Sequence, residues 1–174
     1  MFYKTVLPSP VGNLLLTSDG KNLTGLWING QKPDFTAENA AERTDLPVFG
    51  QTSLWLSRYF AGKKPLPAEL PLAPSGNTFR LKVWRILSKI PYGTTTTYGA
   101  VARRVESETG GRISAQAVGG AVGRNPISVI IPCHRVVGAN GGLTGYAGGI
   151  QLKIKLLEIE KIALDIPKRR CISV

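Results

Sequence analysis

Residues 131–136 read Ile131-Pro132-Cys133-His134-Arg135-Val136, and they place one of the chain's two cysteines directly before its single histidine. A thiolate attacks where a thiol does not, and an imidazole that accepts the thiol proton, directly or through a water, supplies the thiolate near neutral pH. The pair in an apolar, strand-like setting therefore suggests a nucleophile and its base. Unpaired cysteine is also a common small core residue, so the dipeptide alone leaves both interpretations open.

The composition is that of a globular chain without a membrane anchor. Its 174 residues fit one ordinary domain or two small ones, and 43% of them are hydrophobic. No apolar run approaches the ~20 residues of a membrane span. The first eight residues are too short and too quickly broken by Pro8 for a signal peptide. We therefore expect a cytoplasmic protein.

The few cysteines and the single histidine limit the redox and metal chemistry. Two cysteines form no disulfide framework in a chain of this size, which agrees with a reducing compartment. Cys133, His134 and Cys171 are also too few, and too widely spaced, to hold a zinc ion. We expect no metal and no cofactor.

The net charge of +11 is concentrated in the second half of the chain. Residues 1–76 contain seven Lys and Arg against six Asp and Glu, whereas residues 77–174 contain fifteen against five. A basic half beside a nearly neutral one indicates a polyanionic partner, because each Lys or Arg that meets a phosphate releases condensed counterions. The alternative is a basic surface that only maintains solubility.

Residues 1–76 have the pattern of a small sheet domain. Apolar runs at residues 14–18 and 23–28 flank Asp19-Gly20, which predicts a β-hairpin. A helix is predicted next from the spacing of five residues: Thr52, Trp55, Leu56, Tyr59 and Phe60. The Pro- and Gly-rich residues 62–76 predict a linker that runs over the surface.

Residues 77–174 have the pattern of a mainly helical second domain. An apolar stripe from Phe79 to Ile90 predicts a helix that Pro91 stops. A second helical pattern from residue 96 breaks at Gly110-Gly111, and a third begins at Ser114, a good N-cap. Two short helices around a glycine turn indicate a helix-turn-helix. The fold class that we predict is therefore α/β, divided into domains 1–76 and 77–174.

Residues 114–123 form an unusually small-sided helix, with glycine at positions 119, 120 and 123. Each glycine costs a helix interior about 1 kcal/mol relative to alanine, so these glycines need a compensating role. Small side chains allow close approach of a neighbouring helix or of a nucleic-acid backbone, and the segment alone does not decide between them. A phosphate loop is a weaker interpretation, since the P-loop Lys-Ser/Thr is missing.

Together these motifs resemble the family of O6-alkylguanine-DNA alkyltransferases, also called methylated-DNA-protein-cysteine methyltransferases. The resemblance covers essentially the whole chain, and the order Pro-Cys-His-Arg-Val at residues 132–136 is its most specific part. The other matching segments are residues 9–12, 90–93, 97–99, 119–126, 137–138 and 145–149.

The resemblance implies a ribonuclease-H-like N-terminal sheet domain and a winged helix-turn-helix-like C-terminal domain that carries the reactive cysteine. It implies direct repair of O6-alkylguanine in DNA, with O4-alkylthymine as a further substrate, by irreversible transfer of the alkyl group to Cys133. His134 would take the thiol proton through a water, and Glu160 would orient His134. An amphipathic helix through Leu152, Leu156, Ile159 and Ala163 could present Glu160, although this glutamate taken alone reads as a solvated helix-face charge.

The resemblance also implies that the base is flipped out of double-stranded DNA whose minor groove holds the helix-turn-helix. Tyr98 would contact the flipped guanine, and Asn125 would join the recognition helix to the active-site segment, where Asn-Pro also reads as a turn. Taken alone, Tyr98 reads as a packing residue at a helix start. The remaining residues expected to bind substrate or DNA are Gln116, Arg124, Arg135, Val136, Tyr146, Ala147 and Gly148. The protein would act as a monomer, with cooperative binding along DNA as an open question.

Two positions depart from the family pattern. Gln116 stands where relatives often have an arginine that fills the gap left by the flipped base, so flipping would be weaker or would depend on Arg112 or Arg124. Ala147 stands where some relatives have serine, but a backbone N–H donor survives that change. The zinc ligands of some animal relatives have no counterpart.

Other interpretations remain at this level. A DNA-binding protein that flags alkylated bases without repairing them would share the fold, but relatives of that kind lack the cysteine. A thiol hydrolase would use Cys133 and His134 as a dyad, although adjacent residues on an extended chain point to opposite faces. The basic segment from Lys168 to Cys171 superficially resembles a prenylation signal, but Ser173 fits that signal poorly, and we expect a tail that adds to DNA affinity.

Overall fold

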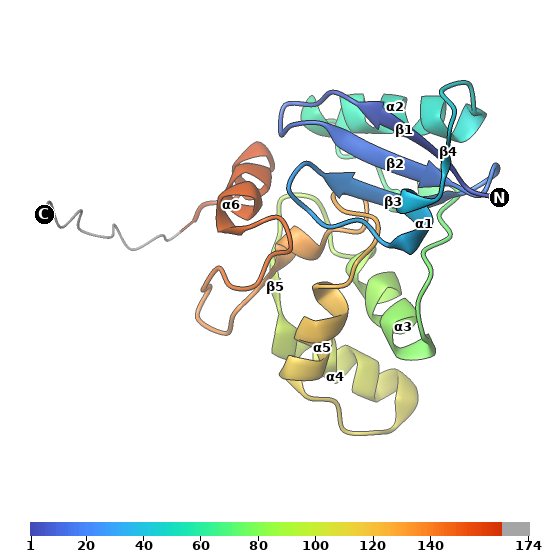
Figure 1. Cartoon of the computed structure of the whole chain (residues 1–174). Helices are drawn as coiled ribbons and strands as arrows, with labels where there is room; N and C mark the ends of the chain where they lie inside the picture. The colour runs from blue at the N-terminus through green and yellow to red at the C-terminus, as the bar shows by residue number, and fades with distance from the viewer. Residues whose placement is uncertain (165–174) are drawn as a thin grey trace, which may run out of the picture.

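A four-stranded sheet with the strand order β3-β2-β1-β4 forms the upper layer of the computed structural model, which describes residues 1–164 except the side chain of Phe35 (Figure 1). Strands β1 to β3 are antiparallel neighbours, and the short β4 pairs parallel to β1. The bounds are Tyr3–Leu7 for β1, Leu14–Ser18 for β2, Leu23–Ile28 for β3 and Ala41–Glu42 for β4. The basic tail and Cys171 lie outside the described residues.

The predicted hairpin between β2 and β3 is confirmed. The carboxylate of Asp19 accepts hydrogen bonds from the backbone N–H groups of Lys21 and Asn22, and Gly20 takes the left-handed region with φ 101°. These are the properties for which turns select Asp and Gly. Every residue of β3 is buried, so the hairpin places a fully covered strand at the centre of the molecule.

Helices α1 (Phe35–Glu38) and α2 (Pro47–Phe60) follow the hairpin, and α2 packs on the sheet (Figure 1). The predicted helical stripe of α2 is buried at Thr52, Trp55, Leu56 and Tyr59. The following segment departs from the prediction of a simple surface linker. After the 3₁₀ turn η1 (Pro67–Glu69), it pairs with the β3 edge, because Leu23 N donates to Pro71 O at 2.8 Å and Ala73 N donates to Leu23 O at 2.9 Å.

The second half of the chain, as far as residue 164, contains four α-helices: α3 (Thr78–Leu87), α4 (Tyr98–Thr109), α5 (Ala115–Val122) and α6 (Ile150–Ile159). The predicted helix-turn-helix is formed by α4 and α5, which lie at the bottom of Figure 1. Gly110 ends α4 with φ 74°, and the Ser114 hydroxyl caps α5 by accepting from Ala117 N. A two-residue parallel ladder joins β5 (Thr96–Thr97) to β6 (Val136–Val137).

The segment that precedes the Cys-His pair is hydrogen-bonded to the edge strand β3 of the sheet. Leu26 N donates to Pro126 O at 2.8 Å, and Ser128 N donates to Leu26 O at 2.9 Å. The expected strand-like setting of the pair is wrong, because Cys133–Arg135 form the 3₁₀ turn η2 before the chain enters β6. Val129 is buried with φ 70°, a left-handed conformation that a β-branched residue adopts only at a cost. The surrounding hydrogen bonds therefore hold Val129 in this unfavourable conformation.

Among residues 1–164, no helix combines the length and apolarity needed to cross a membrane. The buried side chains of both halves instead form one continuous core.

Candidate active site

Cys133 begins the η2 turn and is only 4% exposed. Its Sγ accepts a hydrogen bond from Asn125 Nδ2 at 3.2 Å. The same amide fixes the turn, because Nδ2 also donates to Ile131 O at 2.8 Å and Oδ1 accepts from Ile127 N at 3.0 Å. Asn125 thus connects the segment after α5 to the cysteine.

The surroundings of Cys133 keep it a thiol at rest. Burial raises the pKa of the thiol above its usual value, while the Asn125 amide, the Tyr146 hydroxyl and the charge of Lys153 act in the opposite direction. A buried thiol of raised pKa attacks poorly until a base removes its proton. The site therefore needs a base close to Cys133.

His134 is fully buried and has two chemically different nitrogens. Nε2 lies 2.6 Å from Glu160 Oε1, whereas Nδ1 has no hydrogen-bond partner among residues 1–164. Burial lowers the pKa of His134 below 6.5 in spite of the opposing effect of Glu160. Because an ionised carboxylate only accepts hydrogen bonds, we assign the proton of the neutral ring to Nε2, which leaves Nδ1 as the basic atom.

Glu160 is fixed as a carboxylate by four surrounding groups. Besides His134, it accepts from Arg135 Nε at 2.9 Å, from Tyr59 Oη at 2.7 Å and from Gly93 N at 3.0 Å. Burial disfavours its charge, but His134 and Arg135 outweigh burial and lower the pKa of Glu160 to about 2. At 3% exposure, Glu160 is not a solvated surface charge.

The expected helix around Glu160 ends earlier than predicted. Helix α6 stops at Ile159, Glu160 is its C-cap and Lys161 takes φ 59°. The turn is closed by backbone hydrogen bonds from Lys161 N to Glu158 O and from Ile162 N to Leu157 O. The carboxylate therefore projects from a helix end rather than from a helix face.

Arg135 lies elsewhere than expected for a residue that contacts DNA. Its side chain is buried, forms the ion pair with Glu160 and donates to Ile90 O at 2.6 Å. Its guanidinium also covers the ring of Tyr92 at 5.7 Å from the centroid. All of these contacts point into the protein, so the geometry assigns Arg135 to the support of Glu160.

Sequence reasoning missed two buried polar residues. Tyr59 reaches Glu160 from α2 in the first half of the chain, and its hydroxyl also lies 3.4 Å from His134 Nε2. Lys153 of α6 is fully buried, and its Nζ donates to Val136 O at 2.6 Å and to Thr144 O at 3.3 Å. Tyr59 was hidden in an apolar stripe. Lys153 carried a usable signal, since it is a lysine at core spacing with Leu156, Leu157 and Glu160.

Beyond the cysteine, the predicted guanine-pocket residues converge from β6, α4 and residues 144–148. Val136 is buried, and the Tyr98 hydroxyl donates to Thr144 O at 3.2 Å. The Tyr146 hydroxyl is also buried, close enough to Cys133 that burial and the thiol raise its pKa. A Cβ at Gly148 would lie 2.4 Å from Leu152 Cδ2, so any larger residue at this position would displace the Leu152 side chain.

The outer face of α5 is exposed and carries small side chains at its glycine positions. Gln116, Gly120, Gly123 and Arg124 are exposed. A Cβ at Gly120 would meet only the guanidinium of Arg124, at 3.8 Å, and one at Gly119 would touch Tyr98 at 3.9 Å. Close packing of a neighbouring helix therefore does not explain Gly119 and Gly120. The remaining interpretation is that they allow a nucleic-acid backbone to approach α5 closely.

Within residues 1–164, no group of three or more His, Cys, Asp or Glu side chains is arranged to hold a metal ion. The converging residues instead form a compact thiol site: Asn125 and Tyr146 surround Cys133, and His134 links to Glu160, Arg135 and Tyr59. No hydrogen bond joins Cys133 Sγ to either nitrogen of the His134 ring, which disfavours a direct dyad.

Comparison with known families matches both halves of the chain. Residues 2–74 match the ribonuclease-like domain of 6-O-methylguanine DNA methyltransferase, and residues 78–162 match its DNA binding domain. The methylated-DNA–protein-cysteine methyltransferase of Haemophilus influenzae is 43% identical over 92% of this chain and 87% of its own length. The corresponding protein of Mycobacterium leprae is 40% identical over 92% and 93%.

Solved structures of similar proteins have the same fold. The O6-methylguanine methyltransferase of Mycobacterium tuberculosis superposes with a TM-score of 0.80 at 40% identity, covering 92% of this chain and 93% of that one. A structure of the M. tuberculosis protein in complex with DNA gives the same TM-score at 39% identity, covering 91% and 93%.

Proposed function

Because the chain belongs to the 6-O-methylguanine DNA methyltransferase family, we propose that it repairs O6-alkylguanine in DNA by moving the alkyl group onto Cys133. The observation that carries the proposal is that the Cys133 thiol, the His134 ring and the Glu160 carboxylate are buried together. In this group His134 Nε2 is bound to Glu160, and His134 Nδ1 remains available as a base. O4-alkylthymine is a further substrate of the same chemistry. The proposed setting is the cytoplasm, where the free Cys133 thiol stays reduced.

The reaction exchanges one bond for another without a cofactor. The Cys133 thiol proton passes to His134 Nδ1 through a bridging water, and the thiolate attacks the sp³ alkyl carbon. The S–C bond forms as the C–O6 bond breaks, and the electron pair of that bond leaves with the guanine. The guanine then takes up one proton, so the protons removed and returned balance.

Glu160 makes this proton transfer favourable. As His134 becomes an imidazolium, its Nε2–H already points at a carboxylate whose pKa is about 2 and which therefore stays ionised. Arg135, Tyr59 and Gly93 hold that carboxylate in place. A fixed charge next to the charge that develops in the transition state lowers its free energy more in a buried site than in water.

The product is a thioether, and hydrolysis offers no easy route back to the thiol. Each molecule of protein therefore acts once. The proposed stoichiometry differs from that of a thiol hydrolase, which releases its acyl group and turns over.

The burial of Cys133 also determines how the substrate must enter. A thiol that is 4% exposed cannot reach a base inside a duplex, so the guanine must be flipped out, at a cost of a few kcal/mol. We propose that α5 enters the minor groove, with Gln116 in the gap left by the base and Arg124 at a phosphate. Tyr98, Val136, Tyr146, Ala147 and Gly148 would then surround the guanine, and one protein monomer suffices for all these contacts.

A titration of repair against protein tests the proposal. An excess of duplex with one O6-methylguanine is incubated with the protein, and guanine restoration is followed to completion. We expect restored guanine to equal active protein and then to stop. Continued turnover would contradict the single-use mechanism, and binding of the duplex without any repair would indicate a protein that only recognises alkylated bases.

A further inference from the structure

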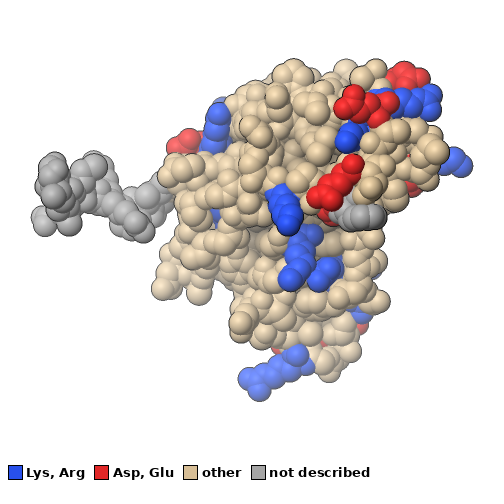
Figure 2. Space-filling model, viewed as in Figure 1, with Lys and Arg blue, Asp and Glu red and all other residues tan. Residues whose placement is uncertain are grey.

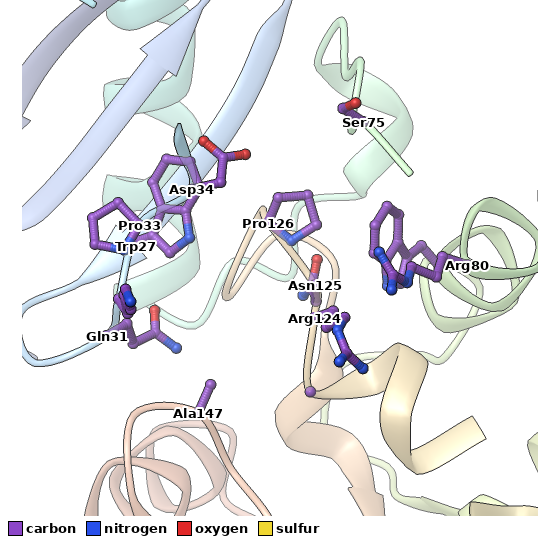
Figure 3. Close-up of a pocket in the computed structure, with 13 residues that line it drawn as sticks. Trp27, Gln31, Pro33, Asp34, Ser75, Arg80, Arg124, Asn125, Pro126 and Ala147 are labelled. Carbon is purple, nitrogen blue, oxygen red and sulfur yellow. The ribbon is translucent and has the colours of Figure 1, made fainter. Parts of the chain in front are cut away.

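A cleft with a cavity volume of about 320 Å³ lies at the junction of the two halves of the chain, beside the site described above (Figure 3). One wall comes from Trp27 of β3 and from Gln31 and Lys32 of the loop after it, and the opposite wall comes from Arg80 of α3. Arg124, after α5, lines the same cleft. Both halves of the chain therefore contribute to the cleft.

The cleft carries more positive than negative charge. Lys32, Arg80 and Arg124 line it, and none of the three has an ion pair with another described residue. The one acidic lining residue, Asp34, is occupied as the N-cap of α1, where its carboxylate accepts from Thr36 N and Ala37 N. Figure 2 shows Lys and Arg side chains gathered in the middle of this face, at the level where sheet and helices meet. Such a concave cationic surface attracts an anion.

The position of the cleft connects it to the thiol site. Asn125, whose amide binds Cys133 Sγ, lines its floor, and Ala147, next to the buried Tyr146, lines its near edge. Arg124 also marks the end of α5, the helix that faces the DNA in the proposed complex. A strand that delivers its base towards Cys133 therefore passes this opening with its sugar-phosphate backbone.

We propose that this cleft binds a phosphodiester of the DNA strand that carries the lesion, so that the N-terminal half of the chain takes part in holding DNA. The inference rests on the proposed function and extends it to Lys32 and Arg80. The guanidinium groups of Arg80 and Arg124 supply planar donor pairs that suit phosphate oxygens, and Lys32 adds a point charge from the opposite wall. Trp27 and Pro126 provide an apolar surface for the adjoining sugar.

Neutralising the cleft tests the proposal through the salt dependence of binding. The variants are Lys32→Gln and the double variant Lys32→Gln/Arg80→Gln. Lys63→Gln, which removes an exposed cation outside the cleft lining, three residues after α2 ends, is the matched control. Affinity for a duplex with one O6-methylguanine is measured over a range of salt concentrations, and circular dichroism checks that each variant is folded.

We expect the slope of log affinity against log salt to fall by about 1 for Lys32→Gln and by about 2 for the double variant, with Lys63→Gln unchanged. A slope unchanged in Lys32→Gln, or lowered equally by Lys63→Gln, would overturn the cleft proposal while wild-type repair still proceeds. Absence of repair by the wild-type protein would instead refute the proposed function, so the two failures are distinguishable.

Discussion

In the proposed mechanism, His134 Nε2–H donates to Glu160 and Nδ1 accepts the thiol proton. The pH dependence of alkyl transfer should therefore report the pKa of this ring. Because burial lowers its pKa below 6.5, the ring stays neutral, and Nδ1 stays basic, into mildly acidic solution. We expect the single-turnover rate to be level from neutral pH down to 6.5 and to fall only as the pH drops below that value. Rapid-quench measurements on one alkylated duplex across pH would give the midpoint. A midpoint at or above 6.5 would contradict the assigned environment.

Loss of the Glu160 charge should affect both the stability of the protein and the rate of alkyl transfer. Glu160→Gln leaves the guanidinium of Arg135 buried without its counter-ion and removes the charge that stabilises the imidazolium. We expect the free energy of unfolding to fall by about 3–5 kcal/mol and the transfer rate to fall by ~10²-fold or more. Chemical denaturation and single-turnover kinetics measure the two effects.

A matched control for this substitution lies two residues away. Glu158 is exposed on α6, so Glu158→Gln removes the same charge outside the site. It should leave both the unfolding free energy and the rate near the wild-type values. Equal behaviour of the two variants would show that Glu160 has no special role.

Tyr59 extends the site into the N-terminal half of the chain. Tyr59→Phe removes one donor to Glu160 Oε1 while keeping the ring that stacks on Trp55. A hydrogen bond to a charged group contributes about 1.5–3 kcal/mol, so we expect a loss of this size in unfolding free energy. The transfer rate should also fall, with DNA affinity unchanged in an equilibrium binding assay. An unchanged rate would mean that Tyr59 is only a packing residue.

At the residue level, sequence reasoning found what lies next to the motif and missed what the fold brings to it. Cys133, Asn125 and His134 lie within ten positions of one another, and the resemblance supplied Glu160. Tyr59 lies 101 positions from Glu160, and its spacing in α2 is that of an ordinary core aromatic. Arg135 belongs to the motif itself, but only the folded structure shows that its guanidinium turns inward.

Helix α5 is the element most directly adapted to close approach. Its outer face presents the exposed Gln116 and Gly120, with Arg124 just beyond the helix end. Its inner residues Val118, Ala121 and Val122 are buried. The helix therefore has a complete apolar anchor on one side and almost no side-chain bulk on the other, which suits a narrow groove.

Gln116 can be tested by adding the charge that it lacks. Gln116→Arg places a cation on the exposed face of α5, where the proposed complex brings it between DNA strands. We expect tighter duplex binding and a salt slope that is steeper by about 1. Fluorescence anisotropy over a range of salt concentrations measures both quantities. Gln51→Arg, at an exposed position of α2, is the control and should change neither. Equal effects at the two positions would mean that α5 does not face the DNA.

Periodicity and caps predicted most elements, and the exceptions have identifiable causes. Ser114, Gly110 and the Asp19-Gly20 turn lie where the local chemistry predicts. The helix through Ala163 was predicted too long because apolar spacing continues past Ile159, while the left-handed Lys161 and its backbone hydrogen bonds end α6. Apolar spacing alone carries no information on such a turn.

Over the whole molecule, β3, an edge strand of the four-stranded sheet, joins the two halves. Leu26 forms backbone hydrogen bonds with Pro126 and Ser128, just before the Cys-His turn, and Leu23 pairs with the linker. The charge and patterning of the sequence predicted a division into two halves. It contained no local signal for these contacts, because each one pairs single residues that are far apart in the chain.

The central claim is that Cys133 accepts the alkyl group, and intact mass spectrometry tests it most directly. The protein is incubated with duplex that contains O6-methylguanine, and its mass is compared before and after, with Cys133→Ala treated in parallel. We predict a gain of one CH₂ unit, located on Cys133 by peptide mapping and absent from Cys133→Ala. Repaired DNA with an unchanged protein mass, or a methyl group mapped to another residue, would contradict the account.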